Sequence, residues 1–229
     1  MPNPGDRVRL TTKEETVEGI LMPGADSKII LIKKDNGYNI GFPKTKNLKL
    51  ILIEKTKEPS SKKPSPQLTS SLPIISILHT GGTIASKVDY RTGGVVSKFS
   101  PEDLLAMFPE LAKIATITSE LVAQMWSDDL RFPHFALLAK KVEQQVKEGV
   151  HGIIIGMGTD NLAVASAALS FIVEQSPIPI IFVAAQRSSD RGGSDAAMNL
   201  ICAAEFITKS DFAGVGICMH AREDETQCV

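Results

Sequence analysis

From residue 74 onward, short apolar runs alternate with segments of helical spacing, and this alternation constrains the fold more than any other feature. The runs have strand length and are apolar almost throughout; they comprise residues 74–78, 114–118, 152–156, 178–184 and 215–219. Continuous apolar runs are typical of parallel strands covered on both faces. Because strands separated by helices are joined by right-handed crossovers, we expect one parallel sheet with helices on its faces.

The helices expected on this sheet are marked by their periodicity and their ends. One helical face is formed by apolar residues three or four positions apart, namely Phe135, Leu138, Val142 and Val146. Gly149 should end this helix, since glycine tolerates the left-handed conformation found there. Three further helices are predicted, one beginning at Ser100 and the others over residues 161–173 and 194–208.

Residues 1–57 follow a different pattern and form a separate predicted domain. Five short alternating or apolar runs predict strands over residues 7–10, 16–21, 28–33, 38–42 and 48–53. Asp35-Asn36-Gly37 is a hairpin signal, because Asn and Gly tolerate the positive φ of tight turns. Five short strands in so few residues predict a small β-barrel. It contains no recognisable group of catalytic side chains, so docking is the expected role.

A predicted linker, residues 58–73, joins this barrel to an α/β domain over residues 74–229. Its prolines, serines and lysines favour an extended, solvated chain. Residues 1–65 carry 13 Lys and Arg against 8 Asp and Glu, whereas the remainder carries 12 against 18. The basic front part is compatible with contact to RNA phosphates. A lysine-rich solvated face is the alternative explanation, and we favour that interpretation.

The composition is that of an ordinary globular protein, with 43% apolar and 22% charged residues. Cys202, Cys218 and Cys228 lack metal-ligand spacing, as do the four histidines, so no metal site is expected. Three unpaired cysteines predict reduced thiols in a reducing compartment. No leader pattern and no apolar run of about 18 residues occurs. We therefore expect a cytoplasmic protein without membrane contact.

Polar loops follow three strands of the predicted sheet, at residues 80–83, 156–160 and 184–191. Ligands of open parallel sheets bind beyond the carboxyl ends of the strands, at a switch point. A shared site is therefore expected at this rim. In the first loop, two glycines precede Thr83, whose hydroxyl suits a nucleophile or an ordinary loop. A phosphate-binding loop is excluded because the Gly-Lys-Ser/Thr ending is missing.

The first loop, TGGTIAS at residues 80–86, resembles the first threonine motif of the bacterial-type L-asparaginase family. The Gly-Thr-Asp sequence at residues 158–160 resembles that family's second signature. Segments 89–95, 185–191 and 36–41 are similar to the D subunits of archaeal glutamyl-tRNA(Gln) amidotransferases. The resemblance covers nearly the whole chain. It implies an α/β fold, a small N-terminal β-barrel followed by a flavodoxin-like asparaginase N-terminal domain.

The resemblance also implies catalytic roles for several of these residues. Thr83 would be the nucleophile of an amidohydrolase, and Tyr90 would assist by moving a proton. Thr159 would supply a second hydroxyl polarised by a lysine, next to the catalytic Asp160. From the residues alone, Thr83 suits a helix cap as well, and Asp160 suits a helix N-cap.

Substrate binding would involve the same rim of the sheet. By resemblance, Asp160 would hold the α-ammonium of an amino-acid amide through a charge-assisted hydrogen bond. Ser127 aligns with the family's carboxylate-binding serine, and Asp128 would line the same pocket. Ser127 is also compatible with a simple turn residue.

Two departures from the family pattern change the expectations. Met157 and Asn161 stand where relatives commonly have His and Thr, so the hydrogen bonds around Thr159 should differ. The family's catalytic lysine would follow residues 218–221, and Lys209 does not match its place. We therefore expect the front portion of a longer subunit, ending before a second α/β domain.

The resemblance predicts a glutaminase subunit that supplies ammonia for converting Glu-tRNA(Gln) to Gln-tRNA(Gln). No cofactor is expected in this chain, whereas ATP and Mg are expected in its partner, the amidotransferase E subunit. Glutamine would be the substrate, and tRNA would bind mostly through the partner. A homodimer within a heterotetramer is expected. A free-standing L-asparaginase and a catalytically impaired, truncated scaffold subunit are the alternatives.

Overall fold

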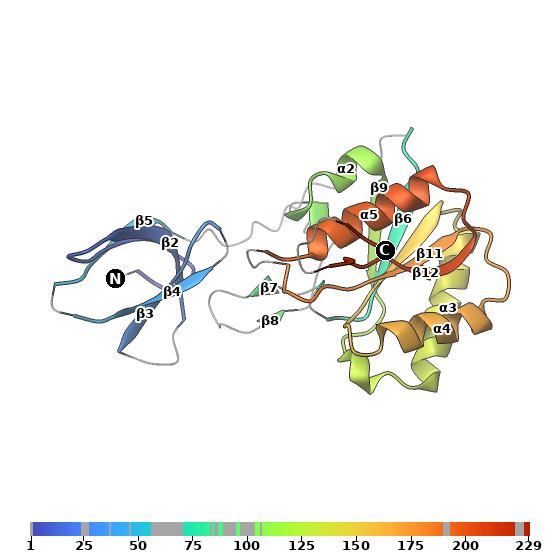
Figure 1. Ribbon diagram of the computed structural model, residues 1–229, viewed down its shortest axis with the longest axis horizontal. Coiled ribbons are helices and arrows are strands. Elements are labelled where there is room, and N and C mark those ends of the chain that lie inside the picture. The colour runs from blue at the N-terminus through green and yellow to red at the C-terminus, as the bar shows by residue number, and fades with distance from the viewer. Residues whose placement is uncertain are drawn as a thin grey trace. The chain divides into compact units, whose positions relative to one another are not determined.

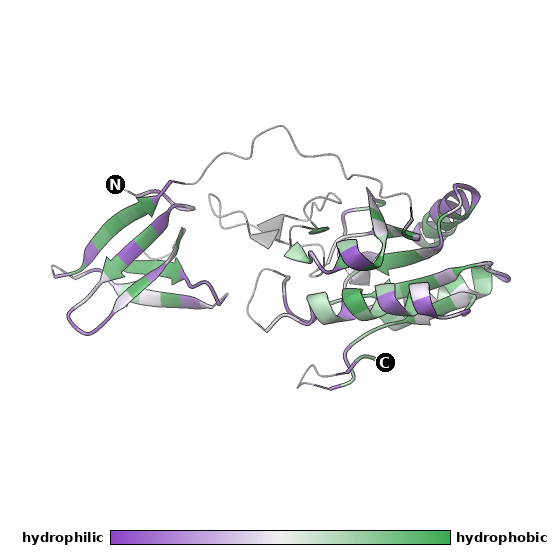
Figure 2. Cartoon of the chain, turned by 90° about the horizontal axis from the view of Figure 1, so that it is seen from above, coloured by the Kyte–Doolittle hydropathy of each residue, from purple (hydrophilic) through white to green (hydrophobic). Residues whose placement is uncertain are grey.

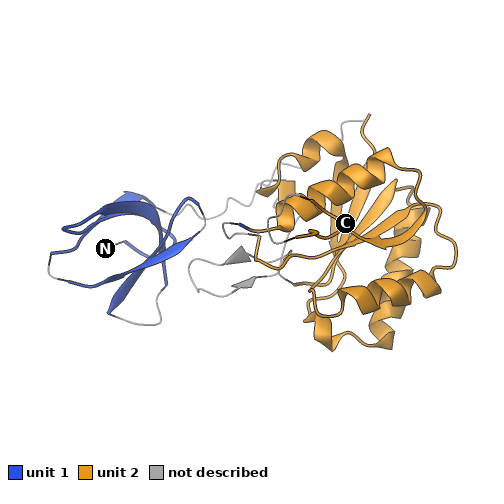
Figure 3. Cartoon of the chain, in the orientation of Figure 1, with its two compact units in different colours: residues 1–63, 87–96, 190–193 blue, residues 64–86, 97–189, 194–229 orange. Residues whose placement is uncertain are grey.

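The computed structural model describes residues 2–23, 28–36, 38–45, 47–55, 71–82, 84, 87–88, 95–96, 104–105, 107–189, 193–222 and 227–229. The chain divides into two compact units (Figure 3). The first comprises residues 1–63, 87–96 and 190–193, and the second comprises residues 64–86, 97–189 and 194–229. Residues 58–70 of the predicted linker and the predicted helix start at Ser100 lie outside the described residues. The predicted domain limits stay predictions.

The first unit is built on an antiparallel sheet that curls around its own core (Figure 1). Its order is β4-β3-β2-β1-β5, with β1 Arg7–Thr11, β2 Thr16–Met22, β3 Ile29–Lys33, β4 Asn39–Pro43 and β5 Lys49–Glu54. All five predicted strands are therefore confirmed. Every second residue of β1 points inward, so that Val8 and Leu10 are fully buried together with Ile32 of β3.

The turn between β3 and β4 is held by local hydrogen bonds. The Tyr38 N–H donates to Asn36 Oδ1 at 3.2 Å, and the Lys34 N–H donates to the Tyr38 carbonyl at 2.8 Å. The Asn36 side chain thus substitutes for a backbone acceptor, which is the usual role of Asn in turns. A further antiparallel pair of strands, each two residues long, was not predicted from the sequence; it joins β7 Lys87–Val88 to β8 Val95–Val96.

The second unit contains the predicted parallel sheet, whose order is β12-β11-β10-β6-β9. The strands are β6 Ile74–His79, β9 Thr116–Leu121, β10 Gly152–Gly156, β11 Pro179–Val183 and β12 Gly214–Ile217. Counted along this unit, the order is 2-1-3-4-5, which is the flavodoxin-like arrangement. In the register, Ile154 of β10 lies between Ile77 of β6 and Ile181 of β11.

Helices cover both faces of this sheet (Figure 1). They are α2 Leu111–Ile114 and α5 Ala196–Lys209 on one face, and α3 Phe132–Lys147 and α4 Leu162–Ile172 on the other. Ile154 packs in the core under α5, whereas Ile153 and Ile155 pack in the core under α3 and α4. Alternate residues of one strand are thus buried on opposite faces, which explains the uninterrupted apolar runs.

The helices of the second unit are less uniformly apolar than its strands. Figure 2 shows largely hydrophobic strands beside helices that carry hydrophilic stripes. The predicted helical face of α3 is confirmed, with Phe135, Leu138 and Val142 buried, and Gly149 follows its end at φ 80°. No helix that the structure describes combines the length and the hydropathy needed to cross a bilayer.

Candidate functional site

The candidate site lies at the carboxyl ends of β6 and β10, where the strand order of the parallel sheet reverses. From β6 the chain crosses to β9 on one side, and β10 then pairs with β6 on the other side. The two connections leave in opposite directions, and such a switch point is where ligands of open α/β sheets bind. Both are loops that the sequence singled out.

Backbone contacts join these two loops directly. Gly82 adopts φ 83°, and a Cβ there would lie 2.5 Å from the Gly158 nitrogen and 2.7 Å from the Met157 carbonyl carbon. Gly81 adopts φ 106°, and a Cβ there would lie 2.9 Å from the Met125 carbonyl oxygen. Side chains would not fit at either position, so the two glycines allow three chain segments to meet.

Hydrogen bonds from Thr80 keep the same segments in place. The Thr80 N–H donates to the Gly156 carbonyl, and the Met125 N–H donates to the Thr80 carbonyl, both at 3.0 Å. Thr80 therefore connects the end of β10 to the segment that leads into residues 126–131. Thr80 is 2% exposed, so these hydrogen bonds are shielded from competing water.

Ser127 and Asp160 come together at this meeting point. Ser127 Oγ donates to Asp160 Oδ2 at 3.0 Å, and Asn161 Nδ2 donates to the Ser127 carbonyl at 2.7 Å. A Cβ on Gly158 would lie 2.6 Å from Ser127 Oγ, so that glycine leaves room for the hydroxyl. Ser127 is buried, whereas Asp160 is exposed, and the carboxylate keeps an open side.

Of the remaining predicted site residues, the structure describes Thr159 and Asp128. Thr83 and Tyr90 lie outside the described residues. Thr159 is half-buried, and its carbonyl accepts the Leu162 N–H at 3.3 Å as α4 begins. Asp128 is exposed in the short 3-10 helix Ser127–Asp129, and its carbonyl accepts from Arg131 Nη1 at 2.7 Å.

A third loop, residues 184–189, follows β11 and reaches the loop after β6. Ser189 Oγ donates to the Ile84 carbonyl at 2.8 Å, and Ile84 itself is buried. The loop is anchored at its other end by Asp195, which accepts the Gln186 and Arg187 N–H groups at 3.0 and 3.1 Å. The sequence indicated a helix start near residue 194, but no sequence pattern predicted that Asp195 binds the N–H groups of this loop.

The cysteines near the end of the chain are free thiols. Burial, together with the neighbouring Cys202, raises the pKa of Cys218 to about 11. Burial, followed by contact with Cys202 and Cys218, also raises the pKa of Cys228. Thiols of this kind are poor nucleophiles at neutral pH, because the reactive thiolate is disfavoured. Within the described ranges, no group of three metal-binding side chains is arranged around a common point.

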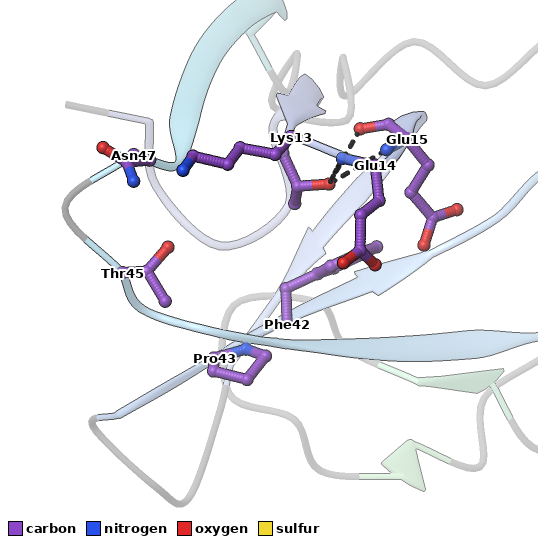
Figure 4. A pocket seen from close by; sticks show the side chains of 8 residues that line it. Lys13, Glu14, Glu15, Phe42, Pro43, Thr45 and Asn47 are labelled. Atoms are coloured by element: carbon purple, nitrogen blue, oxygen red, sulfur yellow. Dashed lines mark hydrogen bonds between the residues drawn. The ribbon is translucent and has the colours of Figure 1, made fainter.

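The first unit has a hollow of its own, with a volume of about 370 Å³ (Figure 4). Phe42 and Pro43 contribute apolar surface, and polar side chains surround them, namely Thr12, Lys13, Glu14, Glu15, Thr45 and Asn47. Thr12 Oγ accepts the Glu14 and Glu15 N–H groups at 3.2 and 3.0 Å, so this hydroxyl stabilises its turn. The mixed charges show no arrangement suited to catalysis.

Comparisons with known proteins give a family match for each of the two main parts of the chain. The family model "Asparaginase, N-terminal" matches residues 74–224, and "GatD N-terminal domain" matches residues 2–53. The D subunit of glutamyl-tRNA(Gln) amidotransferase from Archaeoglobus fulgidus is 42% identical over 98% of this chain and 52% of the relative. The corresponding D subunit from Pyrococcus furiosus is 40% identical over 98% and 53%.

A structural comparison identifies the same fold. The crystal structure of a probable cytoplasmic L-asparaginase from Campylobacter jejuni matches with a TM-score of 0.54 at 26% identity, covering 64% of this chain and 43% of that chain. The chain spans about half the length of the curated relatives it matches. With an asparaginase model matching most of its length over a flavodoxin-like sheet, the chain belongs to the asparaginase family.

Proposed function

We propose that this chain provides the amide-hydrolysing site of a tRNA-dependent amidotransferase, acting as its D subunit. Glutamine would be hydrolysed to glutamate and ammonia, and the partner E subunit would use the ammonia, with ATP and Mg, to amidate Glu-tRNA(Gln). The observation that carries the proposal is the contact of the Gly82 and Gly158 loops beside the Ser127–Asp160 hydrogen bond. Similarity to the D subunits along 98% of the chain supports the amidotransferase context.

In the proposed reaction, Thr83 Oγ attacks the side-chain amide carbon of glutamine while Tyr90 passes the hydroxyl proton on to the departing nitrogen. The carbon–nitrogen bond then breaks, the nitrogen leaves as ammonia, and water hydrolyses the resulting ester to glutamate and free Thr83. Thr159 would contribute its hydroxyl at the same centre. The contact between Gly82 and Gly158 supports this assignment, because it brings the residues just before Thr83 and Thr159 together.

Recognition of the amino-acid end would fall to Asp160 and Ser127. Ser127 has one hydroxyl hydrogen, which is donated to Asp160 in the structure. When the substrate α-ammonium binds Asp160, that hydroxyl is free to turn towards the α-carboxylate. Asp160 and Ser127 thus exchange their mutual hydrogen bond for bonds to the charged groups of the substrate, and neither residue is left without a partner. Asp128 would line the outer edge of this pocket.

The proposal is tested by measuring glutamine binding and ammonia release for two variants. Asp160→Asn removes a charge-assisted hydrogen bond worth about 1.5–3 kcal/mol, so the Kd for glutamine should rise roughly 10- to 150-fold. Ser127→Ala should weaken binding by a smaller factor. Asp129→Asn, an exposed neighbour in the same 3-10 helix, is the matched control and should bind as the parent does. Equal Kd values for all of these proteins would refute the assignment.

The amidotransferase role is tested separately by adding the E subunit and Glu-tRNA(Gln). Formation of Gln-tRNA(Gln) from glutamine, lost in Asp160→Asn, is the expected result. The structural likeness to an L-asparaginase favours a second candidate, a free-standing asparaginase. That enzyme would prefer asparagine to glutamine, and its turnover would be the same with or without the E subunit and tRNA. Binding of glutamine without hydrolysis would indicate a scaffold role for the chain.

A further inference from the structure

We infer that Asp195 is a positioning residue for the loop that carries Thr83, acting through Ser189; this inference rests on the proposed function. Asp195 is 1% exposed and stands at the start of α5. Its carboxylate makes no capping bond to its own helix. Instead it accepts hydrogen bonds from Gln186 and Arg187, nine and eight positions earlier on the loop that joins β11 to α5.

The carboxylate of Asp195 is surrounded by donors. Both oxygens lie 3.0 Å from the Gln186 nitrogen, and Oδ1 also lies 3.1 Å from the Arg187 nitrogen. Oδ2 accepts from Asn199 Nδ2 at 3.0 Å and lies 2.9 Å from His220 Nδ1. A buried carboxylate is tolerated only when it is hydrogen-bonded in this way, so the loop and Asp195 depend on each other.

Two neighbouring side chains hold the same loop by its carbonyls. Asn199 Nδ2 donates to the Ala184 carbonyl at 3.0 Å, and Ser194 Oγ donates to the Arg187 carbonyl at 2.9 Å. Two N–H groups and two carbonyls of residues 184–187 are therefore bound by side chains at the start of α5. These hydrogen bonds to residues 184–187 set the position of Ser189, which lies two residues further along the loop.

Ser189 then holds the chain that follows Thr83. Its hydroxyl donates to the Ile84 carbonyl at 2.8 Å across 105 positions of sequence. Ile84 is 3% exposed and packs in the same core as Val183 and Ala196. On the other side of Thr83, Gly82 is packed against Gly158. Both covalent neighbours of the proposed nucleophile are thus held, one of them through Asp195 and Ser189.

The test uses 6-diazo-5-oxo-L-norleucine, a glutamine analogue with a reactive diazoketone, and measures by mass spectrometry how fast the full chain is labelled at Thr83. Ser189→Ala should reduce the maximal labelling rate roughly 2- to 12-fold, which is the loss expected for one hydrogen bond, with unchanged affinity for the reagent. Ser189→Thr keeps the hydroxyl and should restore the rate. Ser188→Ala, on the same loop, should label as the parent does.

The outcomes separate this inference from the proposed function. A parent protein that binds the reagent without labelling Thr83 would overturn the proposed hydrolytic function of this chain and, with it, the positioning role. Labelling of the parent at Thr83 with an equal rate in Ser189→Ala would overturn the positioning role alone. Asp195→Asn should lower the maximal rate at least as much as Ser189→Ala, and amide exchange in peptides covering residues 80–86 should increase in both variants.

Discussion

A pair of glycine substitutions can test whether the loops after β6 and β10 touch as the structure shows. Gly82 and Gly149 have nearly the same backbone conformation, with φ 83° and φ 80°. They differ in surroundings, since nothing lies within 4 Å of a Cβ built on Gly149, whereas a Cβ on Gly82 meets the backbone of Met157 and Gly158. Gly149→Ala is therefore a matched control for Gly82→Ala.

The expected losses of stability follow from the backbone conformation of the two glycines and from the atoms around them. An alanine in the left-handed region costs about 1–2 kcal/mol, and this cost is common to both variants. Gly82→Ala adds contacts of 2.5 to 2.8 Å with three backbone atoms, which cannot rotate away as a side chain would. Overpacking of this kind costs about 1–3 kcal/mol. The free energy of unfolding should therefore fall by about 2–5 kcal/mol for Gly82→Ala and by about 1–2 kcal/mol for Gly149→Ala.

The assay is urea unfolding followed by circular dichroism at 222 nm. All helices that the structure describes belong to the second unit, so this signal reports the unit that contains both glycines. Gly82→Ala should also weaken glutamine binding, because relief of the contact moves one loop away from the other. Equal destabilisation by the two substitutions would show that Gly82 does not approach Gly158 closely.

Three further measurements test other parts of the structure. Ile154→Ala, at a fully buried position of β10, should lower the free energy of unfolding by about 2–5 kcal/mol in the same assay, and a loss below 1 kcal/mol would contradict its packing in the core under α5. Burial raises the pKa of Cys218 from about 9 to about 11, so the folded state holds its proton longer than the unfolded chain does. The contribution of this thiol to stability is then fully present below pH 9 and should be lost as the pH rises through 11, with a smaller loss in Cys218→Ala. Arg7 lowers the pKa of Asp35 by a two-point hydrogen bond with distances of 2.8 and 2.7 Å, so Arg7→Gln should raise that pKa in an NMR titration, and an unchanged value would contradict the pair.

Local patterns were sufficient to predict most of the elements. The strands of the parallel sheet are buried on both faces, so each one is visible as an apolar run without reference to its neighbours. The prediction of β9 was the least accurate, since this strand was predicted at residues 114–118 and is found at Thr116–Leu121. It lies at the edge of the sheet, and its polar residues Ser119 and Glu120 are only partly covered, which weakens the apolar signal.

The candidate site was predictable to the level of its loops but not of its contacts. Loops at the carboxyl ends of parallel strands must share a rim, so their polar residues could be grouped from sequence alone. The hydrogen bond between Ser127 and Asp160 depends on a separate loop that returns to this rim after β9. The role of Asp195 depends on partners on the loop after β11 and beyond β12, at Gln186, Arg187 and His220.

The sequence by itself determined the strands of the two five-stranded sheets, the helices α3, α4 and α5 and the rim on which the polar loops lie, because hydrophobic periodicity acts over a few neighbouring residues. Only the tertiary structure decided the strand order, the contact of Gly82 with Gly158 and the hydrogen bonds around Asp195. These features join residues that are far apart in the chain. Their distances are set by how the sheet and helices pack, and local sequence patterns carry no information about that packing.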